Sequence, residues 1–148
     1  MLKLAMFLRY QIFILTDELR PDGKVSVLNS ERLQSANGTL QTIHGYAMTS
    51  SEPGKLTVHL ETVPVNAAYW VLSLGPATYG PDMKYQYSVV SDNVRGTLFV
   101  LARDPDLFKQ TYAAEVEAFL TITGFTAFYN KPVITYHGKD CAYNTDHH

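Results

Sequence analysis

Cysteine is nearly absent from this 148-residue chain, since Cys141 is the only one. A single cysteine excludes an intrachain disulfide, and no histidine or acid is spaced so as to activate its thiol as a nucleophile. Basic runs are missing too: the twelve Lys and Arg residues are scattered, and the formal net charge is -2. This charge pattern predicts no nucleic-acid partner.

Long apolar runs and the common catalytic motifs are also absent. The first residues, MLKLAMFLRYQIFIL, superficially resemble a secretory signal, but Arg9 interrupts the run and no small-residue cleavage site follows. The run is too short and too charged to span a membrane. The chain contains no Gly-x-Ser-x-Gly, no phosphate-binding loop and no His-Glu-x-x-His. We therefore expect no catalytic residue, metal site, cofactor or transmembrane segment.

What the chain does contain is enough apolar sequence for one domain over residues 1–148, with 46% apolar and 18% charged residues. Ten tyrosines indicate either a strand-rich composition or an aromatic ligand cage. Residues 10–103 are typical of a β-meander. Its expected strands are residues 10–19, 24–29, 39–48, 56–61, 68–74, 85–91 and 97–102. The clearest alternation predicts that Leu56, Val58 and Leu60 face inward, whereas the inward face of 39–48 stays open.

The apolar period changes from strand to helix after residue 103. Asp104 supplies a helix N-cap, and Pro105 follows at the first helical position, where its missing N–H is tolerated. Gly124 can end the helix in the left-handed conformation. The expected helix, residues 104–124, carries one apolar stripe: Phe108, Tyr112, Val116, Phe119 and Leu120. We expect this stripe to pack on the sheet, and residues 125–148 to form an extension with a short edge strand at 132–136.

Three short segments carry a resemblance to a known family. They are YWVL at 69–72, YSVVSD at 87–92, and LARDP at 101–105 followed directly by the helix. In this order they resemble the lipocalin family, particularly its apolipoprotein D-like branch, over roughly residues 12–143. The resemblance implies an all-β fold, an antiparallel up-and-down barrel with one C-terminal helix packed outside. The pattern alone predicts antiparallel β structure with one helix, and favours a barrel.

The resemblance also implies a ligand cavity inside the barrel. Together with the alternation of residues 56–61, it predicts these lining residues: Leu56, Val58, Leu60, Trp70, Leu72, Gln86 and Ser88. Trp70 either points into this cavity or is an ordinary core tryptophan. His44 and His59 are either haem ligands, as in some lipocalins, or simply exposed or hydrogen-bonded histidines.

The chain departs from the family pattern near its beginning. Lipocalins open with a strand bearing Gly-x-Trp, a tripeptide that is missing here. We therefore expect residues 1–9 to be an undefined segment, and the barrel to be incomplete. The strand that starts at Tyr10 would then expose an edge that favours self-association. Arg103, which stacks on the missing tryptophan in the family, needs another partner. Cys141 lacks the second-strand cysteine with which many apolipoprotein D-like lipocalins pair it.

The predicted function is binding or transport of a small hydrophobic molecule, such as a lipid, fatty acid, sterol or pigment. One alternative is an enzyme of the same fold acting on a lipid or carotenoid, for which Tyr46 or Tyr87 would have to supply the reactive group. Another is a ligand-free module that acts through oligomerisation. The resemblance implies a secreted or secretory-pathway protein, and Asn37-Gly38-Thr39 is a possible glycosylation sequon at Asn37 that would also make a good turn.

Overall fold

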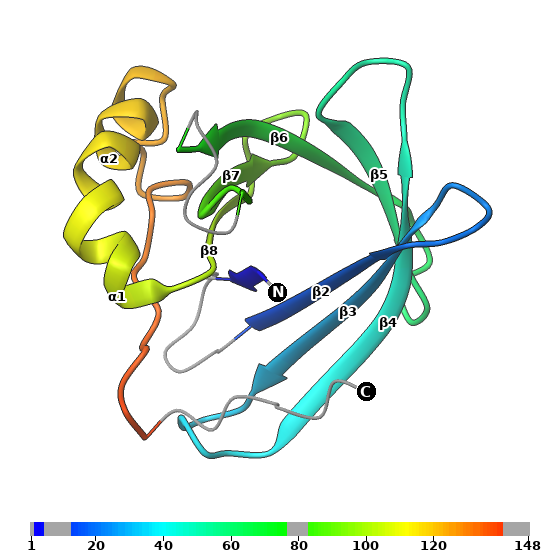
Figure 1. Cartoon of the computed structure of the whole chain (residues 1–148), viewed down its shortest axis with the longest axis horizontal. Helices are drawn as coiled ribbons and strands as arrows, with labels where there is room; N and C mark the ends of the chain where they lie inside the picture. Colours follow the sequence, from blue (N-terminus) through cyan, green and yellow to red (C-terminus); the bar gives the residue numbers. More distant parts are fainter. Residues whose placement is uncertain (1, 5–12, 77–82, 141–148) are drawn as a thin grey trace.

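The computed structural model describes the backbone of residues 2–4, 13–76 and 83–140, and their side chains from residue 19 onward. Eight antiparallel strands follow one another around a closed barrel, and the helical segments come after the last strand (Figure 1). The expected fold class is thereby confirmed: an all-β, up-and-down barrel with one C-terminal helix outside it.

Each strand pairs with its neighbour in the chain, and the first also pairs with the last. The strands are β1 (Leu2–Leu4), β2 (Phe13–Leu19), β3 (Val25–Arg32), β4 (Leu40–Thr49), β5 (Lys55–Leu60), β6 (Ala67–Gly75), β7 (Tyr87–Ser91) and β8 (Leu98–Ala102). All seven strands predicted from the sequence are present with boundaries shifted by a few residues, except that residues 10–12 lie outside the described part of the chain. The expected turn between β2 and β3 forms around Gly23, whose φ is 78° and whose N–H donates to the carbonyl of Arg20.

Strand β1 corrects the expectation for the start of the chain. Its three residues pair with β2, with Leu2 opposite Leu15, and Lys3 lies opposite Ala102 of β8. The edge of β2 is therefore covered where the sequence predicts it to be open, and the barrel closes within the chain. The sequence conceals this strand because no turn residue marks a reversal after it. The connection itself falls within residues 5–12, outside the described residues.

The helix begins and ends as predicted. Oδ1 of Asp104 accepts hydrogen bonds from the backbone N–H groups of Asp106 and Leu107, at 2.9 and 3.0 Å. Three segments follow without a break: α1 (Pro105–Leu107), the π-helical segment η1 (Phe108–Tyr112) and α2 (Ala113–Ile122). Gly124 takes a φ of 88° after the last turn. No described helix has the length and apolar character needed to cross a membrane.

The helix packs on the outside of the barrel beside the strands β6 to β8 (Figure 1). Its predicted apolar stripe meets Tyr87, Val89 and Leu98 on the outer face of β7 and β8, where Phe125 joins the same cluster. Residues 132–138 contain no regular structure, so the predicted edge strand at 132–136 is wrong. The physical reason is the closure of the barrel, which leaves the side chain of Ile134 86% exposed instead of paired to a sheet edge.

Candidate functional site

Side chains on the inner face of the barrel enclose a cavity of about 260 Å³. Residues directly opposite each other in antiparallel strands share a face, so the pair Ala47 and Val58 brings β4 and β5 to the same wall. The cavity is lined by Val25, Val27, Asn29, Ala47, Leu56, Val58, Leu60, Ala67, Ala68, Tyr69, Asp92, Thr97 and Phe99. Most of this wall is apolar.

The structure places the predicted β5 residues on this wall and settles which face of β4 is inward. Leu56, Val58 and Leu60 all line the cavity, as their alternation predicts. On β4 the inward residue is Ala47, and Tyr46 lies on the outer face with its ring centroid 5.0 Å from that of His59. Lys24 approaches the same tyrosine ring to 4.6 Å from the outside.

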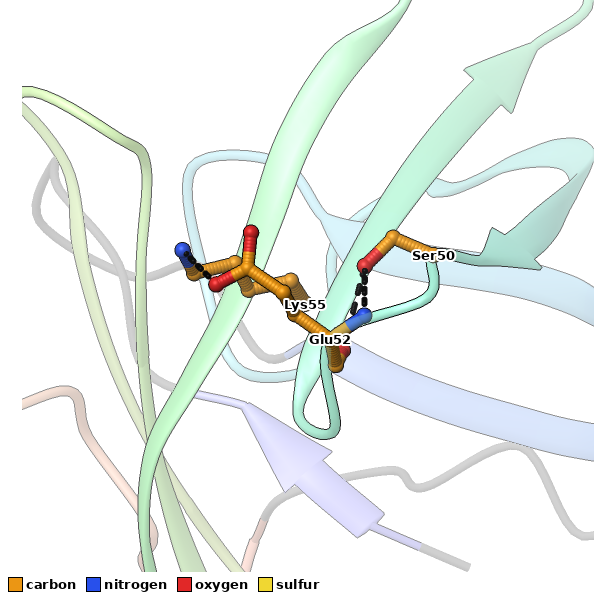
Figure 2. A network of polar contacts seen from close by, with 3 residues as sticks. All are labelled: Ser50, Glu52 and Lys55. Carbon is orange, nitrogen blue, oxygen red and sulfur yellow. Dashed lines mark hydrogen bonds and ion pairs between the residues drawn. The ribbon is translucent and has the colours of Figure 1, made fainter.

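Trp70 does not line the cavity, which corrects the prediction that it points inward. On β6 the inward residue is its neighbour Tyr69, which lies opposite Leu56, whereas Trp70 lies opposite Lys55 on the outer face. The Lys55 ammonium is 4.3 Å from the Trp70 ring centroid. Figure 2 shows how the lysine is held: Nζ donates to Oε2 of Glu52 at 2.5 Å. The hydroxyl of Ser50 accepts from the backbone N–H of Glu52 in the same turn.

Leu72 also points away from the cavity, because it shares the outer face of β6 with Trp70 by the alternation of the strand. Val71 packs with the inner core cluster, while Leu72 packs with the cluster under the helix. On β6 and β8 the sequence reasoning missed the cavity residues Ala67, Ala68, Tyr69 and Phe99. A period of two runs through Tyr69 and Val71 but equally through Trp70 and Leu72, so the sequence alone does not choose the inward face of β6.

Gln86 and Ser88 are buried, although neither lines the described cavity. They alternate along the chain with Tyr87, which faces the helix, and so share the inner face of the barrel with Val90. The side-chain amide of Gln86 donates to the carbonyl of Lys84 at 2.9 Å. These two residues belong to the packed interior next to the cavity.

Arg103 finds a partner that replaces the missing tryptophan. Its Nε donates to the carbonyl of Tyr85 at 2.6 Å, and its guanidinium carbon lies 4.9 Å from the ring centroid of the same residue. One neighbouring tyrosine thus supplies both the hydrogen bond and the aromatic face.

Three polar residues interrupt the apolar wall: Asn29, Asp92 and Thr97. Oδ1 of Asn29 is buried and has no hydrogen-bond partner among the described residues. The carboxylate of Asp92 accepts hydrogen bonds from the N–H groups of Gly96 and Val94, each at 2.9 Å, and from the hydroxyl of Thr97. Burial acts to raise the pKa of Asp92, but these hydrogen bonds outweigh it and lower the pKa below its ordinary value.

Comparison with known proteins supports the same architecture. Residues 15–129 match the lipocalin-like domain family, which covers most of the chain and nearly the whole barrel and helix. The chain belongs to this lipocalin-like family. It is similar to temperature-induced lipocalin-1 of Arabidopsis thaliana, with 30% identity over 108 residues, or 69% of this chain and 54% of that relative. The lipocalin-like chain therefore spans about half the length of the curated relative it matches.

The remaining candidate residues of this lipocalin-like barrel lie outside its cavity. His44 is exposed, and Nδ1 of His59 lies 3.0 Å from Oδ1 of Asn66 on the outer face. Tyr46 and Tyr87, the residues weighed for an enzymatic role, are also on outer surfaces of the barrel wall. Within the described ranges, no group of three His, Cys, Asp or Glu side chains comes together as a metal site.

Proposed function

We propose that this lipocalin-like protein binds and carries a small hydrophobic molecule in its barrel cavity, without covalent chemistry. The observation that carries the proposal is the composition of the cavity wall, which is apolar except at Asn29, Asp92 and Thr97. Transfer of apolar ligand surface from water to such a wall is favourable by roughly 25 cal/mol per Å² before the costs of association. A few polar groups in an apolar pocket are the usual means of orienting a ligand.

The size of the cavity narrows the class of ligand. Its volume of about 260 Å³ is just below the range of about 300–1,000 Å³ that is usual for small-molecule sites. This supports the smaller members of the predicted classes, such as a single-chain lipid or a compact ring compound, over a large pigment. Tyr69 and Phe99 add aromatic surface to the wall, which suits flat or unsaturated ligands.

A cavity-filling variant tests the proposal. We expect the wild-type protein to bind the neutral apolar fluorophore Nile red with saturation at one site. Val58→Phe places extra volume in the cavity and should weaken this binding by about tenfold or more, a loss of at least about 1.4 kcal/mol. His59→Phe is the matched control, since it places the same ring on the outer face of the same strand, where His59 lies opposite Tyr46. Thermal melts verify that both variants fold.

Absence of saturable binding in the wild type, or equal binding by the two folded variants, would contradict the proposal. The fluorescence of Trp70 offers an independent check, measured with a ligand that does not absorb in the range of tryptophan excitation and emission. Because Trp70 lies on the outer face beside Lys55, we expect its emission to change little when the cavity fills. A tryptophan that pointed into the cavity would instead change its emission on ligand binding.

We also propose that the protein follows a secretory route and belongs with the apolipoprotein D-like branch. The support is the family resemblance of residues 101–105 together with the sequon at Asn37, whose side chain is exposed in the β3–β4 connection. Expression in a eukaryotic secretory system should give a glycosidase-sensitive protein in the medium, and Asn37→Gln should lose the sensitivity. Retention of the unglycosylated chain inside the cells would contradict this part of the proposal.

A further inference from the structure

The polar residues of the cavity wall gather at one end of the barrel. Asn29 lies in the second half of β3, Asp92 directly follows β7, and Thr97 directly precedes β8. The β3–β4 and β7–β8 connections lie at the same end, because successive strands run antiparallel around the barrel. Toward the opposite end the wall is formed by Val25 and Leu56, each near the beginning of its strand. The three polar residues therefore lie toward one end of the cavity, beside Leu60 and Ala67, whereas the other end is apolar.

The amide of Asn29 provides an unused hydrogen-bonding group at the polar end. Its Oδ1 is buried against the cavity and receives no hydrogen bond within the described part of the chain. Leaving a buried polar atom unpaired costs about 1–3 kcal/mol, which a ligand group can recover. A hydroxyl suits this position in either orientation of the amide, because it donates to the oxygen and accepts from the nitrogen.

Charge at the same end acts against an anionic ligand. Asp92 is the one charged residue among the described residues that line the cavity, and the wall includes no Lys, Arg or His. Arg95, in the turn next to Asp92, directs its guanidinium toward Gly124 at the end of the helix. A ligand carboxylate in this cavity would lose its hydration without meeting a cation, and would face the Asp92 carboxylate as a like charge.

We propose that the cavity selects a neutral amphiphile with a terminal hydroxyl over a carboxylate of the same chain length, and that the hydroxyl binds at Asn29. This inference rests on the proposed ligand-binding function, and it names the class of ligand. The apolar part of such an alcohol would lie along Val58 and Tyr69 toward Val25 and Leu56.

Decanol and decanoate test the inference, because they share one alkyl chain and differ in the head group. Displacement of Nile red at neutral pH should show decanol binding about tenfold tighter than decanoate, or more. Asp92→Asn keeps the shape of the side chain and removes its charge, so decanoate should gain affinity while decanol changes little. Asn29→Leu removes the amide and should weaken decanol several-fold without weakening Nile red.

A control variant and the opposing outcomes complete the test. Ser26→Leu makes a comparable change on the other face of β3 and should leave both ligands unaffected. Equal or tighter binding of decanoate overturns the inference, as does decanol binding that is unchanged in folded Asn29→Leu. If Nile red binds and neither ten-carbon ligand displaces it, the inference fails while the proposed function stands. If Nile red does not bind at all, both fail.

Discussion

The phenol of Tyr87 donates a hydrogen bond of 2.6 Å to Oε1 of Glu115, and this bond joins the outer face of β7 to α2. The tyrosine ring lies 5.9 Å from the ring of Phe108 and 5.5 Å from that of Tyr112, measured between centroids. Burial, followed by the hydrogen bond to Glu115 and its charge, raises the pKa of Tyr87 to about 12. One side chain therefore secures the helix to the barrel by both ring packing and a polar bond.

Removal of this phenol oxygen should destabilise the protein measurably. Tyr87→Phe keeps the ring contacts and leaves Glu115 without its donor, so we expect the free energy of unfolding in urea to fall by about 1–2 kcal/mol. Tyr136→Phe is the matched control, because it removes an equally short bond to Asp140 from a tyrosine that is 45% exposed. The control should lose less than about 0.5 kcal/mol. Equal losses of unfolding free energy in the two variants would show that the buried Tyr87 bond stabilises the protein no more than the exposed Tyr136 bond.

The same bond predicts a dependence of stability on alkaline pH. The folded-state pKa of Tyr87, about 12, lies above the ordinary value of 10.0. Its contribution to the free energy of unfolding is therefore complete below pH 10 and is lost as pH rises through 12. The stability difference between wild type and Tyr87→Phe should narrow across this interval in urea titrations. A difference that stays constant to pH 12 would contradict the raised pKa.

Docking of the helix can be tested with a buried carboxylate. Val116 is 3% exposed beneath α2, so Val116→Asp places an unpaired charge between helix and barrel. We expect a loss of about 3–5 kcal/mol in unfolding free energy. Ala118→Asp adds the same group to the exposed side of α2 and should have a small effect. Similar melting temperatures for the two variants would mean that the helix does not depend on this contact.

Closure of the barrel by β1 predicts the behaviour of a shortened chain. Deletion of residues 1–4 removes the backbone that pairs with Phe13, Ile14 and Leu15 of β2, leaving their N–H and C=O groups unpaired. Such an edge tends to pair with other chains, so the shortened protein should self-associate in light scattering. The full chain should be monodisperse. A shortened chain that is equally monodisperse would show that β1 is not needed to cover this edge.

Local signals in the sequence predicted much of the fold. The cap at Asp104, the left-handed Gly124 and the helical stripe each depend on a few neighbouring residues, and all three are present. The alternation of β5 likewise fixes which side chains can reach the interior, since the period of a strand leaves two choices only. These features need no knowledge of the rest of the chain.

The inward face of β6 required contacts that the sequence does not display. Placing Trp70 inward instead of Tyr69 would turn every side chain of β6 to the other face of the sheet, and either residue could line a cavity. In the structure Trp70 faces outward against Lys55, which lies across from it and pairs with Glu52. Leu72 then falls on the helix side, because it is two residues from Trp70 on the same face. Strand β1 was missed because no turn residue follows it and because its pairing with β8 joins residues far apart in the chain.

Asn29, unlike Tyr69, could have been assigned to the cavity wall from the sequence alone. It follows Val25 and Val27 at the same period of two, and so belongs to the inner face of β3 by the rule that places those valines. An amide side chain at an inward position of a strand indicates a hydrogen-bonding role inside the barrel. In similar barrels, a polar residue among the inward apolar residues of a strand is therefore a candidate ligand-binding residue.

The contact between Arg103 and Tyr85 bears on the order in which the chain assembles. It closes a loop of eighteen residues, and the bonds from Tyr87 to Glu115 and from Asn130 to the carbonyl of Arg95 close loops of 28 and 35 residues. The β7–β8 hairpin and its helix can therefore form early, because short loops are closed at low entropic cost. Pairing of Lys3 with Ala102 joins segments far apart in the chain. We therefore expect the seam between β1 and β8 to form last during folding and to open first in hydrogen exchange.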